Sequence, residues 1–152
     1  MTIAAAADAD AGEVLTVQRA AYVSEARLYD NPHLSALTES LASVREAIAS
    51  EIVLVARAGT RIVGAVRGRV EGTVCHVGRL VVAPDVQGMG LGRRLLLAVE
   101  ARVPASVRTF ALFTGDRSAS NLGLYRKLGY KRVREERVAD TLSLIHLEKT
   151  VP

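Results

Sequence analysis

Tryptophan is absent from this chain of 152 residues, cysteine occurs once, and aromatic residues together make up only 4% of the sequence. The single cysteine, Cys75, excludes an internal disulfide bond and a metal site built from several cysteines, and it fits a reducing, cytoplasmic compartment. Because aromatic rings are so scarce, the hydrophobic content of 49% predicts a core of valine, leucine, isoleucine and alanine.

Long apolar runs and targeting signals are missing as well. No segment is apolar for long enough to cross a membrane, and the first residues include Asp8 and Asp10 rather than the basic start of a secretory signal. No repeat, low-complexity tract or linker divides the sequence, so we expect one domain over residues 1–152. His33 and His146 have no cluster of partner ligands, and we expect no metal site.

The net charge of +4 and the isoelectric point near 9.6 raise the question of a nucleic-acid partner. The basic residues are interleaved with acids, however, as in residues 131–137, and no aromatic residues alternate with them to stack on bases. We therefore expect neither a nucleic-acid nor a membrane partner. A small basic nucleic-acid binder is the weakest functional hypothesis, and it predicts salt-dependent association with DNA or RNA.

What the sequence does contain is a glycine-rich segment between an apolar strand and a leucine-rich helix. The strand ends at Ala83-Pro84, and the segment Gln87-Gly88-Met89-Gly90-Leu91-Gly92-Arg93-Arg94 leads into the helix. Alternate glycines let the backbone approach an anion closely, and the first amide groups of a helix donate hydrogen bonds to it. Two arginines in a first turn would oppose the helix dipole, which indicates that an anion binds nearby.

Two other phosphate-binding motifs do not match this segment. A dinucleotide site needs G-x-G-x-x-G and an acidic residue about twenty positions later, whereas the glycines here are spaced G-x-G-x-G. A nucleotide P-loop ends in Gly-Lys-Ser or Gly-Lys-Thr, which the sequence lacks.

Hydrophobic periodicity predicts a mixed α/β chain with the order β-α-α-β-β-β-α-β-α-β-β. Asp10 and Glu13 have the spacing of a capping box for the first helix, which extends to about Leu28, and a second helix starts near Thr38. The remaining elements are strands over residues 2–7, 52–56, 61–70, 74–83, 108–114, 131–138 and 141–148, and helices after residue 91 and after Ser118 or Ser120.

The segment from Gln87 to Gly92 resembles the Q/R-x-x-G-x-G/A signature of the GNAT superfamily of N-acetyltransferases, and the element order resembles the complete fold of that family, a single domain with a mixed central sheet flanked by helices. The resemblance implies acetyl coenzyme A as cofactor and direct transfer of its acetyl group to a primary amine. The implied cofactor-binding residues are Leu80, Val81, Val82, Gln87, Gly88, Met89, Gly90, Leu91, Gly92, Arg93, Arg94, Asn121 and Tyr125.

The resemblance also suggests catalytic residues. Asn121 and Tyr125 are four residues apart on one helix face, and they resemble a family pattern in which the asparagine contacts the cofactor and the tyrosine is the general acid. His76 is the first candidate for a general base, because strand alternation would place it on the same face as Val82. Glu71, Glu39 or a water molecule are alternatives.

The acceptor remains open at this point: a small amine or a peptide amine both fit. Tyr22 and Tyr29 share a helix face, and we interpret them first as an apolar face resting on the sheet, with a wall of the acceptor pocket as the alternative. A non-catalytic protein that binds coenzyme A is the main alternative function. A homodimer is also compatible with the resemblance.

Overall fold

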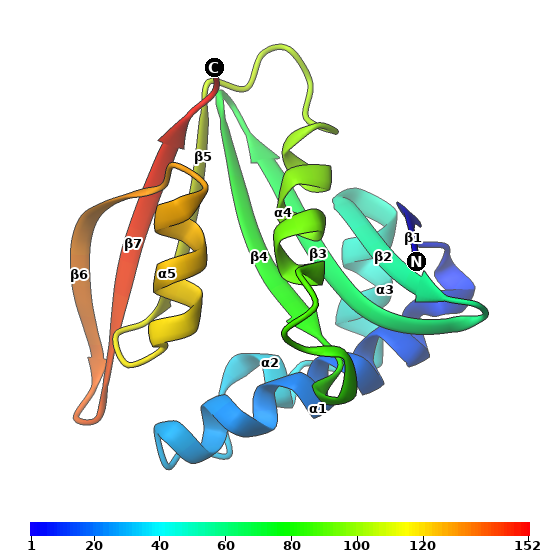
Figure 1. Cartoon of the computed structure of the whole chain (residues 1–152), viewed down its shortest axis with the longest axis horizontal. Coiled ribbons are helices and arrows are strands. Elements are labelled where there is room, and N and C mark those ends of the chain that lie inside the picture. The colour runs from blue at the N-terminus through cyan, green and yellow to red at the C-terminus, as the bar shows by residue number, and fades with distance from the viewer.

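A computed structural model describes residues 1–152 as a seven-stranded sheet with helices on both faces (Figure 1). The predicted order is confirmed, with one additional short helix, α2. The elements are β1 (Thr2–Ala5), α1 (Ala11–Leu28), α2 (Ser35–Thr38), α3 (Leu41–Ser50), β2 (Ile52–Ala58), β3 (Arg61–Glu71), β4 (Val74–Val82), α4 (Leu91–Glu100), β5 (Thr109–Gly115), α5 (Ala119–Lys127), β6 (Lys131–Ala139) and β7 (Leu142–Thr150).

The predicted capping box of α1 is wrong. The carboxylate of Asp10 accepts a hydrogen bond from the amide of Ala7 at 2.8 Å and another from Arg57 at 2.7 Å. Glu13 accepts from the amide of Ile62 at 2.6 Å. Both acids therefore connect the start of α1 to β2, to β3 and to the preceding turn, instead of capping the helix.

The sheet has the strand order β1-β2-β3-β4-β5-β7-β6, and only β4 and β5 are parallel. These two strands pair at three positions, Val74 with Thr109, Cys75 with Phe110 and His76 with Ala111. Beyond His76 they diverge, and Figure 1 shows a V-shaped opening that widens toward α1 and α2. The backbone of β4 from Val77 onward thus has no strand partner on that side.

A β-bulge interrupts β4 just where the opening begins. Ala65 pairs with Val81 and Arg67 with Gly78, so β4 contains one residue more than β3 between these pairs. Arg79 adopts φ +49°, the left-handed region that a non-glycine residue rarely occupies. The extra residue reverses the alternation of side chains, so residues after the bulge face the opposite side from those before it.

The core is aliphatic, as the composition predicts, and packs α4 closely against the sheet. Leu95, Leu96 and Val99 of α4 are fully buried. The close approach depends on glycine, because a Cβ added to Gly64 in β3 would lie 2.9 Å from Leu95 Cδ1. Cys75 is buried in the same layer, as expected for a small apolar residue. None of the helices combines the length and apolar composition needed to span a membrane.

Candidate active site

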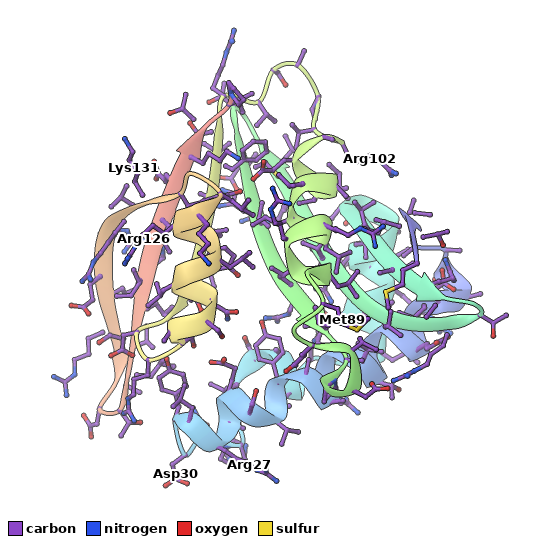
Figure 2. All side chains as sticks on the ribbon, viewed as in Figure 1. Arg27, Asp30, Met89, Arg102, Arg126 and Lys131 are labelled. Carbon is purple, nitrogen blue, oxygen red and sulfur yellow. The ribbon has the colours of Figure 1, made fainter.

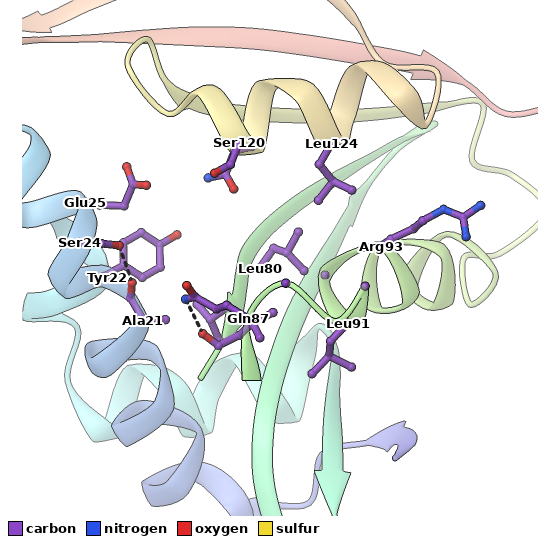
Figure 3. Close-up of a pocket in the computed structure, with 16 residues that line it drawn as sticks. Ala21, Tyr22, Ser24, Glu25, Leu80, Gln87, Leu91, Arg93, Ser120 and Leu124 are labelled. Atoms are coloured by element: carbon purple, nitrogen blue, oxygen red, sulfur yellow. Dashed lines mark hydrogen bonds between the residues drawn. The ribbon is translucent and has the colours of Figure 1, made fainter. Parts of the chain in front are cut away.

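A cavity of about 460 Å³ occupies the opening between β4, α4, α5 and α1 (Figure 3). Leu80, Val81 and Val82 of β4 form its floor, and Ser120, Asn121 and Leu124 of α5 line the opposite side. Tyr22 and Glu25 of α1 line one end, while Arg93 in the first turn of α4 lies at the other. The cavity therefore runs along the strand that the splayed sheet leaves unpaired.

The glycine-rich loop gives this cavity a set of backbone donors. Gly88 and Gly90 have φ values of +81° and +79°, which only glycine adopts without strain. The first hydrogen bond within α4 runs from the amide of Arg94 to the carbonyl of Gly90, so the amide groups of residues 91–93 have no partner inside the helix. Gln87 Nε2 donates to the Val82 carbonyl at 3.1 Å and joins the loop to β4.

Most of the predicted cofactor-binding residues line this cavity, but three do not. Met89 is 66% exposed at the tip of the loop, as Figure 2 shows. Arg94 points to the N-terminus, where its guanidinium donates to the Met1 carbonyl at 3.2 Å. Tyr125 lines a neighbouring cavity instead. The residues present at the first cavity are Leu80, Val81, Val82, Gln87, Gly88, Gly90, Leu91, Gly92, Arg93 and Asn121.

The neighbouring cavity, of about 400 Å³, lies deeper in the V between α1 and the β6–β7 hairpin. It is lined by residues from five separate parts of the sequence, which are Tyr22, Glu25, Tyr29, Asn31, His33, Leu34, Ser35, Ala36, Val77, Gly78, Arg79, Leu80, Phe113, Thr114, Gly115, Asn121, Tyr125, Val138, Leu142 and Leu144. Tyr22, Glu25, Leu80 and Asn121 belong to both cavities. The two spaces therefore meet at these four residues.

Tyr125 lies beside this junction. It is only 6% exposed, and burial raises the pKa of its phenol well above the ordinary range, with Tyr22 and Glu25 adding to the shift. The phenol is therefore protonated at neutral pH. Tyr125 and Asn121 lie on the same face of α5, as their four-residue spacing predicts, and both line the second cavity.

Both interpretations of Tyr22 and Tyr29 find support, because Tyr22 packs against the core and both residues line the second cavity. The Tyr29 hydroxyl accepts a hydrogen bond from the Arg117 amide at 2.7 Å, and its ring lies beneath the Arg117 guanidinium. A methyl group added to Gly115 would overlap this hydroxyl, so glycine is required there. Tyr29 is thus a fixed part of the wall and not merely core filling.

The structure does not bring His76 to either cavity. The expectation that His76 and Val82 share a face is wrong, because the bulge at Arg79 lies between them and reverses the alternation. His76 also lies in the paired part of β4, opposite Ala111, and not in the splayed part. Gly78, directly before Arg79, is the one local signal of the bulge, because an isolated glycine within a strand often marks such an irregularity.

Glu71 and Glu39 are also outside both cavities. Glu71 is exposed and pairs with Arg69 at 2.6 Å, whose hydrogen bond lowers the pKa of the carboxyl group. Burial would raise the pKa of Glu39, but hydrogen bonds from Arg67, Gln18 and Ser43 outweigh it and bring the pKa to about 2. Glu39 is therefore a structural anion that joins α1, α3 and β3.

Sequence reasoning missed Glu25, the only carboxylate that lines the cavities. Its Oε2 accepts a hydrogen bond from Ser118 Oγ at 2.7 Å, and no lysine or arginine lies within ion-pair distance. Ser118 is at the N-cap position of α5, yet its side chain serves Glu25 instead of the helix. The spacing of Tyr22, Glu25 and Tyr29 along one face of α1 was the signal that could have identified it.

No group of three or more histidine, cysteine, aspartate or glutamate side chains is arranged to hold a metal ion.

Several solved structures have the same fold as this chain. The chain aligns over 99% of its length with 98% of the PaiA N-acetyltransferase of Thermoplasma acidophilum in complex with coenzyme A, at 18% identity and a TM-score of 0.81. It covers 93% of YncA, a putative acetyltransferase of Salmonella typhimurium with acetyl-CoA, using 99% of its own length, at 17% identity and a TM-score of 0.79.

A third structure, the ribosomal-protein-S18-alanine N-acetyltransferase of Escherichia coli, aligns over 92% of its length with 98% of this chain, at 18% identity and a TM-score of 0.79. At such identities the likeness concerns the fold alone. Comparison with curated protein sequences gave no match. A sequence model described as the acetyltransferase (GNAT) domain matches residues 25–151, and the chain therefore belongs to the GNAT acetyltransferase family.

Proposed function

We propose that this protein transfers an acetyl group from acetyl-CoA to a primary amine. The observation that carries the proposal is the junction of the two cavities, one lined by the glycine-rich loop and the start of α4, the other by tyrosines and aliphatic side chains. Two molecules can occupy these spaces at once, with their reacting ends beside Tyr22, Glu25 and Asn121. Direct transfer needs this arrangement.

On the donor side, the free amides of residues 91–93 and the positive end of α4 suit the pyrophosphate of the cofactor. Arg93 adds a positive charge at the same end. The unpaired backbone of β4 at Leu80, Val81 and Val82 offers hydrogen-bonding groups to the amides of the pantetheine arm. Asn121 lies where the thioester end would meet the second cavity.

Bound acetyl-CoA supplies an activated acetyl group, whose carbonyl carbon forms a bond to the amine nitrogen while the carbon–sulfur bond breaks. Tyr125 is protonated and can donate this proton to the departing sulfur, and the proton that the nitrogen loses as the amide forms restores the phenol. Because the ammonium form must first lose one proton to become a nucleophile, each turnover releases one proton to solvent. A backbone amide of β4 near Val82 is the donor for the developing oxyanion.

Cys75 gives no support to a route through an acetylated cysteine. It is fully buried between Gly68 and Val99, and burial raises the pKa of its thiol to about 11. A ternary-complex mechanism therefore predicts intersecting lines in initial-rate kinetics with both substrates varied. Parallel lines would contradict it.

Thermal unfolding with and without acetyl-CoA tests the donor half of the proposal. A ligand at about 100 times its Kd stabilises the folded state by roughly 2.7 kcal/mol, which raises the melting temperature by several degrees. Release of coenzyme A thiol in the presence of a panel of amines tests the transfer itself. Binding of acetyl-CoA with no transfer to any amine would instead indicate a regulatory protein that binds coenzyme A.

A further inference from the structure

The second cavity differs in chemistry from the first, because its walls are mostly aromatic or aliphatic. Tyr22 and Tyr29 come from α1 and its end, Phe113 from β5, and the remaining apolar surface from β4, the 31–36 segment and the β6–β7 hairpin. In Figure 3, Tyr22 projects from α1 toward β4, and Glu25 projects toward the start of α5, where it accepts a hydrogen bond from Ser118. A molecule in this cavity would bury an apolar body against these walls.

The same cavity contains a single negative charge that is not neutralised within the protein. Glu25 accepts one hydrogen bond from Ser118 through Oε2, and Oε1 has no hydrogen-bond partner. The one arginine of the wall, Arg79, contacts Glu39 at 3.4 Å and Ser35 at 3.4 Å. No second carboxylate lines either cavity.

We infer that the acceptor is a monoamine with one ammonium group and a compact aliphatic or aromatic body, and that Glu25 binds this ammonium at the junction of the two cavities. This inference rests on the proposed function. Position and charge agree, since Glu25 lines both cavities and its free oxygen is beside the space where the nitrogen must meet the thioester. The acceptor nitrogen is thus drawn to the reacting end, and the body fills the cavity of about 400 Å³.

The same walls disfavour acceptors with several charges. Each further ammonium of a polyamine or an aminoglycoside would need its own carboxylate, and burying it without one costs several kcal/mol. Arg79 would also repel a second cation. These acceptors should therefore be poor substrates even though each carries a primary amine.

The test compares 2-phenylethylamine and isoamylamine with spermidine and kanamycin as acceptors at saturating acetyl-CoA. We expect kcat/KM for the two monoamines to exceed that for the two polycations by about 100-fold or more, as expected when charges are left unpaired in a buried site. Preference for spermidine or kanamycin overturns the inference while leaving the acetyltransferase proposal intact. Failure of acetyl-CoA to raise the melting temperature counts against the proposed function itself.

Glu25→Gln isolates the role of the charge. We expect KM for 2-phenylethylamine to rise about 10- to 100-fold, while the melting-temperature shift produced by acetyl-CoA stays unchanged. Glu46→Gln, which removes the same charge from the exposed face of α3, is the matched control and should leave KM unchanged. Equal KM values for wild type and Glu25→Gln would overturn the assignment.

A neutral ligand of the same shape gives a measurement that a general loss of folding would not reproduce. In the wild type, 2-phenylethylamine should bind about 10-fold or more tightly than 2-phenylethanol, because only the amine pairs with Glu25. In Glu25→Gln the two ligands should bind within about 2-fold of each other, with 2-phenylethanol binding as in the wild type. A preference for the amine that survives in Glu25→Gln would show that another group binds the ammonium.

Discussion

The two cavities share four residues but are built in different ways. The first cavity, which we call the donor cavity after its proposed ligand, is formed mainly by backbone: two glycines with positive φ, the first amides of α4 and the edge of β4 that β5 leaves unpaired. The second cavity, which we call the acceptor cavity, is formed by side chains from segments spread between Tyr22 and Leu144. A backbone-built site needs a short contiguous motif, whereas a site built from side chains can change with single substitutions. The difference explains why one cavity can be identified from sequence and the other cannot.

The largest effect is expected at Tyr125, which we propose as the proton donor in the transfer. Tyr125→Phe removes the hydroxyl that we propose as the proton donor but preserves the buried ring, so kcat should fall about 100- to 1000-fold. The affinity for acetyl-CoA, measured by titration, should stay within about 2-fold, because the hydroxyl lies outside the donor cavity. Turnover equal to that of the wild type would remove Tyr125 from the mechanism.

The second-largest effect is expected at the buried ion pair between Glu39 and Arg67. Glu39→Gln removes the negative charge that pairs with the buried guanidinium of Arg67. The free energy of unfolding, measured by urea denaturation, should therefore fall by roughly 3 kcal/mol. Glu46→Gln on the exposed face of α3 is the control and should change it by less than about 0.5 kcal/mol. A small loss for Glu39→Gln would contradict the structural role.

The pH dependence follows with a definite sign. The pKa of Glu39 is about 2 in the folded protein and near 4.5 in the unfolded chain, so its contribution is fully present above pH 4.5. It is lost as the pH falls toward 2, because the unfolded state then takes up the proton more readily. Unfolding curves recorded from pH 6 downward should therefore show a steeper loss for wild type than for Glu39→Gln.

A smaller effect, on the affinity for acetyl-CoA, is expected at Gly90 in the glycine-rich loop. Gly90→Ala places a side chain at φ +79° and crowds the anion site, so acetyl-CoA affinity should fall about 10-fold. Gly59→Ala imposes a similar strain at φ +63° in the β2–β3 turn, far from the cavity, and has open space for a methyl group. Both variants should lose about 1 kcal/mol of stability, and only Gly90→Ala should lose affinity. Equal affinities would mean that the loop does not bind the cofactor.

The smallest effect is expected at His76. Because it lines neither cavity and lies in the paired part of β4, His76→Ala should leave the acidic limb of the pH–rate profile unchanged. A limb displaced by about one pH unit or more would restore His76 as the general base.

Much of the fold follows from local patterns in the sequence. Helical and strand periods predict every strand and every helix except α2, and the loop from Gln87 to Gly92 indicates where an anion would lie. Gly78 is a weak local signal for the bulge at Arg79, but the position of the bulge depends on the register between β3 and β4, which the residues of β4 alone do not determine. Glu25 has a local signal in its spacing from Tyr22 and Tyr29 on α1, but its contact with Ser118, 93 residues away, follows only from the fold.

The short seam between β4 and β5 has a mechanical consequence. Four strands lie on one side and three on the other, and only three residue pairs join them. Side chains also join the two halves across the opening, since Glu25 accepts a hydrogen bond from Ser118 and Tyr29 accepts one from the Arg117 amide. A ligand lying along β4 would take up hydrogen bonds that β5 leaves unmade, and in that sense it would complete the sheet. The cofactor would then occupy the place of a strand beside β4. Amide hydrogen exchange along Leu80–Val82 would slow when it binds.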